Sequence, residues 1–141
     1  MEKQPTSPES RKTILVVDDH VLVRQLIADV LSHVDGYNLL LAESGTEGLQ
    51  RSREFPGEIH LLLTAFRMHG MSGISLATAM TVDRPMLKVL VMSALPQDMQ
   101  GHNYGWHFLT RPFMASQLRA LVAGLVFPDA KSRYAAPEPS E

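Results

Sequence analysis

Several short apolar runs of this chain are followed at once by a residue whose chemistry matters. Asp18 and Asp19 follow the first run, Ser93 follows a later one and Arg111 another, while one run ends at Ala65. Two adjacent carboxylates can share a divalent cation, although after a strand they more often form a solvated turn and cap the next helix. A hydroxyl and a guanidinium can donate hydrogen bonds to anionic oxygens. The methyl group of Ala65 has no lone pair and cannot act as a nucleophile.

The elements that must position these residues are predicted from hydrophobic patterning between residues 12 and 127. Short apolar runs alternate with helix-like stretches, which is the pattern of βα units that form a parallel sheet. Strands are predicted at 14–17, 38–42, 59–64, 86–92 and 106–109, and helices at 22–34, 45–54, 74–80 and 114–127. We therefore expect an α/β fold of the flavodoxin-like type, a doubly wound five-stranded parallel sheet in the order 2-1-3-4-5. Its functional crevice should lie at the carboxyl ends of the strands, where these residues converge.

Apolar stripes indicate which helix faces are buried. In the first helix the stripe is predicted to comprise Leu22, Leu26, Val30 and Val34, flanked by Ile27 and Leu31. In the last helix it comprises Met114, Leu118, Leu121, Val122 and Leu125. Ser44 and Glu47 have the spacing of a capping box that starts the second helix, and Phe55-Pro56-Gly57 should end it.

Bulk properties favour one domain without an electrostatic preference for nucleic acid or anionic membranes. The chain has 141 residues, no cysteine and a formal net charge of −2. The absence of cysteine excludes disulfides and thiol catalysis, and no apolar run reaches the length of a membrane span or of a signal-peptide core. We expect a cytoplasmic protein with a folded region at 12–127 between disordered tails at 1–11 and 128–141.

The strand-end residues resemble those of the response regulator receiver domain, the CheY-like family. That family has an acidic pair after the first strand, an aspartate after the third, a threonine or serine followed by alanine after the fourth, and lysine-proline after the fifth. The matching segments here are Asp18-Asp19, Ser93-Ala94, Pro112-Phe113 and the loop Met68-x-Gly70-Met71-x-Gly73. The likeness covers roughly residues 12 to 127 and implies the same fold.

In a working receiver, the resemblance implies, the three carboxylates hold Mg²⁺ and the hydroxyl and lysine contact the phosphoryl oxygens. This chain departs from the pattern at three positions, with Ala65 for the phosphoacceptor aspartate, Arg111 for the lysine and His69 for a usual proline. We therefore expect a degenerate phosphorylation site formed by Ala65, Ser93 and Arg111. Asp18 and Asp19 should bind Mg²⁺ weakly or only as a vestige, and no other cofactor is expected.

The altered residues have structural interpretations as well. Arg111 suits a salt bridge with Asp18 or Asp19, which would relieve the repulsion between these carboxylates. Ser93 is expected to have a capping or turn role, and Thr64 should point to the opposite sheet face from Ala65. None of the histidines has metal-ligand spacing, and His69 alone stands near the pocket; the six are His20, His33, His60, His69, His102 and His107.

The segment between Ser93 and Arg111 is about one helical turn shorter than the family usually has. Glycines and an asparagine make it a poor helix former, so the fourth helix should be short, distorted or absent. Tyr104, Trp106 and Phe108 crowd this region, and the family's aromatic switch residue maps to Phe108. These aromatics either fill a gap left by the shortened helix or form a docking patch for a partner or a homodimer.

We expect a phosphorylation-independent receiver-like signalling module of a two-component or phosphorelay-related system, which acts by binding a protein and is not an enzyme. One alternative is a phospho-accepting regulator that uses a non-standard acceptor. Another is a sensor that holds a small ligand in the strand-end crevice. No nucleic acid or membrane is expected as a partner.

Overall fold

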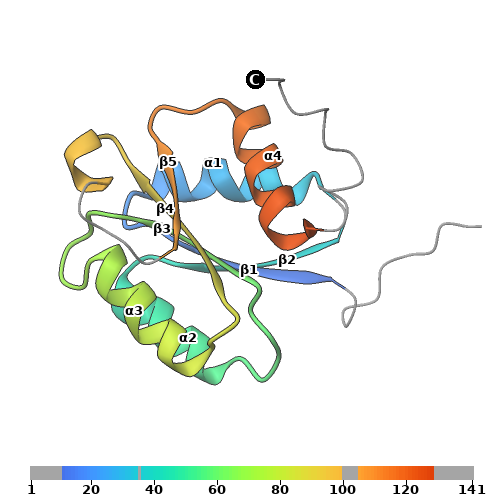
Figure 1. The fold of residues 1–141 in the computed structure, drawn as a ribbon, viewed down its shortest axis with the longest axis vertical. Helices are drawn as coiled ribbons and strands as arrows, with labels where there is room; N and C mark the ends of the chain where they lie inside the picture. The colour runs from blue at the N-terminus through green and yellow to red at the C-terminus, as the bar shows by residue number, and fades with distance from the viewer. Residues whose placement is uncertain (1–10, 35, 100–104, 129–141) are drawn as a thin grey trace, which may run out of the picture.

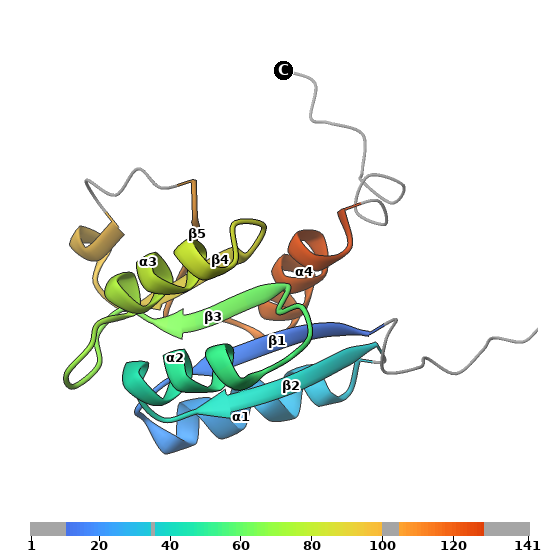
Figure 2. The same ribbon diagram turned by 90° about the horizontal axis from the view of Figure 1, so that it is seen from below.

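The computed structural model describes residues 11–34, 36–99 and 105–128. They form a five-stranded parallel sheet in the order β2-β1-β3-β4-β5, as predicted (Figure 2). The strands are β1 Lys12–Val17, β2 Tyr37–Ala42, β3 Leu61–Ala65, β4 Lys88–Ser93 and β5 His107–Thr110. The helices are α1 Val21–Ser32, α2 Gly45–Glu54, α3 Gly73–Asp83 and α4 Ala115–Val126, with a 3₁₀ helix at Pro96–Met99.

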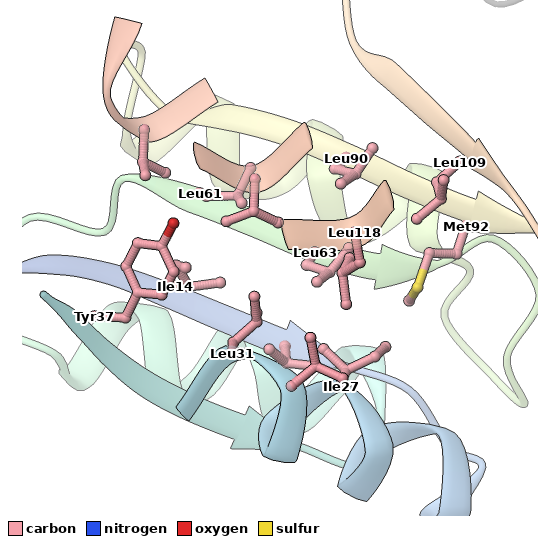
Figure 3. Packing of buried hydrophobic residues seen from close by; sticks show 14 residues of the cluster. Ile14, Ile27, Leu31, Tyr37, Leu61, Leu63, Leu90, Met92, Leu109 and Leu118 are labelled. Atoms are coloured by element: carbon pink, nitrogen blue, oxygen red, sulfur yellow. The ribbon is translucent and has the colours of Figure 1, made fainter. Parts of the chain in front are cut away.

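The helices cover the sheet in two layers, with α1 and α4 on one face and α2 and α3 on the other (Figure 1). On the first face, Ile27 and Leu31 of α1 point toward Leu63 of β3 and Leu118 of α4 (Figure 3). On the other face, Leu76 and other side chains of α3 pack against β1, β3 and β4. Because both faces are covered, the strands are apolar runs without alternation.

The predicted face of α1 is wrong in its first half. Leu22 and Leu26 are exposed, whereas Ile27, Val30 and Leu31 are buried and Val23 packs beside them. The stripe from Val23 through Ile27 has the same helical spacing as the predicted one, so spacing alone could not decide which of the two meets the sheet.

The last helix also differs from its predicted stripe. Met114 precedes the first turn as the N-cap residue and its side chain is 70% exposed, so it is not part of the core. Leu118, Val122 and Val126 are buried, and Leu121 and Leu125 are partly buried beside them; the predicted stripe ended at Leu125 and did not include Val126.

Boundaries shift where prolines and caps decide them. Helix α3 extends beyond the predicted end at Met80 and stops at Asp83. It stops there because Arg84, which precedes Pro85, is not in the helical conformation. The turn that follows delays β4 until Lys88. Helix α2 starts and stops as predicted. Its start is capped by Ser44, whose Oγ accepts from the amide of Glu47 at 3.0 Å. The reciprocal bond goes from the amide of Glu43 to the Glu47 carboxylate, at 2.7 Å, and not from Ser44.

The predicted short fourth helix corresponds to the single 3₁₀ turn Pro96–Met99 in the described chain. Tyr104 and the rest of 100–104 lie outside the described residues, as do 1–10 and 129–141 of the two predicted tails. Among the helices that the structure describes, none is long and apolar enough to span a bilayer.

Candidate functional site

The sheet brings the predicted site residues to one edge. Residue Val17 of β1 pairs with Thr64 of β3, and Ala65 pairs with Met92 of β4, so the residues that follow these positions are neighbours in space. The four strands that carry Asp18, Ala65, Ser93 and Arg111 all end at this edge. The convergence expected from a parallel sheet is thus present, and we call this cluster the strand-end site.

Asp18 forms a buried ion pair with Arg111. The guanidinium Nη2 donates to Oδ2 of Asp18, whose side chain is 2% exposed, while the Arg111 side chain is 25% exposed. The other carboxylate oxygen accepts from the amide of His20 at 2.9 Å. The prediction that Arg111 pairs with one of the two aspartates is confirmed, with Asp18 as its partner. Each charge compensates the other in a place where an unpaired charge would be costly.

Asp19 is held by the loop that follows β3. Its Oδ2 accepts from the backbone amide of His69 at 2.9 Å and lies 2.9 Å from the Nδ1 of the same residue. The amide hydrogen bond is the main cause that lowers the pKa of Asp19 below its ordinary value. A proline at position 69 could not donate this bond, because proline has no N–H. The sequence pointed to His69 but not to its pairing with Asp19.

Ala65 ends β3 beneath this loop and is buried. Thr64 beside it is completely buried, and its hydroxyl donates to the carbonyl oxygen of Ala65 at 2.9 Å. The chain then turns so tightly that a Cβ atom on Gly73 would overlap the same carbonyl oxygen. Glycine is therefore required at the start of α3 for close packing.

Ser93 belongs to a network that the sequence did not reveal. Its hydroxyl lies 2.5 Å from Oδ2 of Asp98 and also accepts from the amide of Leu95 at 3.0 Å. Arg67 donates two hydrogen bonds to the same carboxylate, from Nε to Oδ2 at 3.0 Å and from Nη2 to Oδ1 at 2.7 Å. The expected turn role of Ser93 is confirmed. Asp98 and Arg67 were missed because their meeting depends on the shape of two loops that are far apart in the sequence.

The residues at this edge do not fit a tight Mg²⁺ site. Magnesium prefers several oxygen ligands that can converge on one point. Here Asp18 is bonded to Arg111 and Asp19 to His69, so each carboxylate already has a cationic or hydrogen-bonding partner within the chain. Across the described residues, no three histidine, aspartate or glutamate side chains are arranged to hold a metal ion.

The aromatic residues near β5 contribute to packing. Trp106 and Phe108 are partly buried and contact the core cluster formed by β1, β3, β4 and α3. This arrangement agrees with the predicted space-filling role of both side chains.

Comparison with known protein families identifies this fold and strand-end pattern. The family model of the response regulator receiver domain matches residues 14–123. The chain belongs to the response regulator receiver domain family. Receiver domains are components of two-component signalling systems. Both the sequence and the fold of this chain are those of a receiver domain.

Similar proteins include response regulators and a chemotaxis protein. The response regulator GacA of Pseudomonas syringae pv. syringae is 34% identical over 86 residues, which cover 60% of this chain and 39% of GacA. The chain thus spans about two fifths of the GacA proteins it matches. The chemotaxis protein CheY of Pseudomonas aeruginosa is 30% identical over 112 residues, covering 75% of this chain and 89% of CheY.

Solved receiver domains share the architecture. A receiver domain protein from Clostridium thermocellum superposes with a TM-score of 0.74 at 25% identity, covering 84% of this chain and 97% of that one. A CheY-like receiver domain protein from Methanospirillum hungatei gives a TM-score of 0.76 at 21% identity, covering 87% and 99% respectively. These likenesses support the fold described above.

Proposed function

We propose that this receiver domain works without phosphorylation, as a signalling module that binds a protein partner in one standing conformation and is not an enzyme. The observation that carries the proposal is the state of the strand-end site. An alanine methyl group stands at the end of β3, and the polar side chains around it are bonded to one another.

The chemistry of phosphoryl transfer needs a nucleophile and several positive or hydrogen-bonding groups around the transferred oxygens. Ala65 supplies no nucleophile. The guanidinium of Arg111 is paired with Asp18, and the hydroxyl of Ser93 is bonded to Asp98. Each group that could contact a phosphoryl oxygen would first have to leave an internal partner.

The same bonds tie together the loops that surround the site. Arg111 connects the end of β5 to β1, His69 connects the β3–α3 loop to β1, and Arg67 connects that loop to the 3₁₀ turn. A set of loops cross-linked in this way supports a single conformation. We expect the module to act in the cytoplasm, with a signalling protein or a second copy of the chain as its partner.

The test is exposure of the protein to acetyl phosphate and Mg²⁺, followed by intact-mass measurement and an amide NMR spectrum. We expect no phosphoryl adduct and an unchanged spectrum. The variant Ala65→Asp is the comparison, because it restores a carboxylate at the position of the missing acceptor. A stable adduct on the wild-type chain would overturn the proposal, and peptide mapping would then show whether His69 or another residue carries the phosphoryl group.

A further inference from the structure

The amino-terminal ends of β1 and β3 are joined through the side chain of His60, which directly precedes β3. The amide of His60 donates to the carbonyl oxygen of Thr13 at 2.8 Å, and the amide of Thr13 donates in return to Nδ1 of the imidazole at 3.0 Å. The pairing of β1 with β3 runs from Ile14 and Leu61 onward. A ring nitrogen therefore accepts a backbone hydrogen bond just before the regular pairing begins.

The hydrogen bonds of this ring determine its protonation state. A backbone N–H can only donate, so Nδ1 of His60 must accept and carries no proton. The hydrogen of the neutral ring is then on Nε2, which lies 3.4 Å from Oε1 of Glu58. These contacts fit the neutral imidazole with its hydrogen on Nε2 and do not fit the imidazolium.

Protonation of His60 would remove the bond from Thr13. The imidazolium carries hydrogen on both ring nitrogens, so the N–H of Nδ1 would face the N–H of Thr13. Thr13 is only 3% exposed, and a buried amide that loses its acceptor is unfavourable unless water reaches it. Either the start of β1 separates from His60 or the ring turns away. Both movements open the same contact between the two strands.

Charged groups of β1, β4 and the segment before β3 lie around this contact. Burial of the ring is the main cause that lowers the pKa of His60 below 6.5; the nearby charge of Lys12 adds to this effect and that of Glu58 opposes it. From β4, Lys88 donates its amide to the His60 carbonyl at 3.2 Å, and its side chain is exposed. The ring is therefore neutral at neutral pH, and the imidazolium forms only at acid pH.

The other side of β1 keeps its contacts when this one opens. The amide of Lys12 donates to the carbonyl oxygen of Gly36 at 2.8 Å, next to β2. The ammonium of Lys12 lies 5.8 Å from the centre of the Phe127 ring, which follows α4. None of these groups titrates near pH 6. The opening is therefore confined to the side of β1 that faces β3, and the pairing from Ile14 onward remains.

We propose that His60 is a pH-sensitive switch between the starts of β1 and β3, closed while the imidazole is neutral and open once it is protonated. The switch lies at the opposite edge of the sheet from the strand-end site and shares no residue with it. It therefore goes beyond the proposed function and does not depend on it. An acid-dependent local state is added to a module whose bonds around Ala65 stay as they are.

The sign of the pH dependence follows from the lowered pKa of His60. The folded chain holds this proton less tightly than the unfolded chain does, whose histidine has the ordinary value of 6.5. The closed contact therefore contributes fully above that pH and is lost as the pH falls through the lowered pKa. Opening is expected on the acid side of pH 6.5 and not on the alkaline side.

The experiment measures amide hydrogen exchange of the full chain by NMR between neutral pH and about pH 5, each rate being divided by the intrinsic rate at the same pH. The protection of the Thr13 amide should fall about tenfold or more over this range. The amide of Leu63, within the regular pairing of β3, should keep its protection. Nitrogen shifts of the His60 ring at neutral pH should show the hydrogen on Nε2.

Matched variants separate the switch from a general effect of acid. In His60→Asn the ring is replaced by an amide that does not titrate, so the protection of Thr13 should no longer depend on pH, whatever its level. Glu58→Gln removes the charge that favours the imidazolium, and the transition should move to lower pH. The control His33→Asn changes an exposed histidine after α1 and should leave the profile of Thr13 unchanged.

Four results would each overturn the inference. They are a pH-independent protection of Thr13 in the wild-type chain, an equal loss in His60→Asn, an equal loss at Leu63, and a neutral ring with its hydrogen on Nδ1. A phosphoryl adduct in the acetyl phosphate experiment would refute phosphorylation independence without bearing on this switch. Conversely, an unchanged Thr13 amide would refute the switch without bearing on phosphorylation.

Discussion

Replacing Arg111 by methionine should destabilise the fold, because Arg111 is the ionic partner of a buried carboxylate. Methionine keeps much of the side-chain length and its apolar contacts but removes the guanidinium. The Asp18 side chain, which is 2% exposed, would then carry a negative charge that has lost its ionic partner Arg111. The expected loss comes from this stranded carboxylate.

The structure sets the size of the effect. Breaking a buried ion pair by removing one partner costs about 3–5 kcal/mol. Asp18 keeps its bond from the amide of His20, at 2.9 Å, and Arg111 is 25% exposed, so the pair is not fully withdrawn from water. We therefore expect about 3 kcal/mol, the lower end of that range. For a domain of this size the melting temperature should fall by about 10–15 °C.

The assay is urea unfolding of a double-mutant cycle. Adding Asp18→Asn to Arg111→Met removes the stranded charge, and about 2 kcal/mol of the loss should be regained. The matched control is Arg51→Met, which breaks the exposed pair with Glu47 (3.4 Å) and should cost less than about 0.5 kcal/mol. If the double variant is no more stable than Arg111→Met alone, the electrostatic explanation is wrong.

Other expectations follow from single contacts. Burial lowers the pKa of His60 below its ordinary value of 6.5, so its neutral form stabilises the fold above that pH and the contribution is lost as pH falls below it. His60→Asn should flatten this part of a urea-measured stability profile between neutral and acid pH. Gly73→Ala should cost about 3 kcal/mol or more by the same assay, because the new methyl group overlaps the carbonyl of Ala65. Asp98→Ala should cost about 2 kcal/mol in urea unfolding, since it leaves the hydroxyl of Ser93 without its closest partner. Ala65→Asp should acquire a melting temperature that rises with added Mg²⁺, whereas calorimetry of the wild-type chain should show no such rise.

Sequence patterning was sufficient for the architecture because the strands are apolar on both faces and the helices alternate with them. It was insufficient for details that depend on competition between similar patterns. Helix α1 contains two overlapping apolar stripes. Ile27 is buried against the sheet, whereas Leu26 is exposed. Pro85 determines where α3 ends, and the helix therefore continues past the last residue of its apolar stripe.

The strand-end site likewise contains contacts that the sequence predicted and contacts that it did not. The meeting of Arg111 with Asp18 was predictable, because parallel strands end at one edge and opposite charges there attract each other. The bonds of Asp98 with Ser93 and Arg67 were not, since they depend on how the 3₁₀ turn packs on the β3–α3 loop. A side chain carried by a loop can be placed only once that loop has a shape.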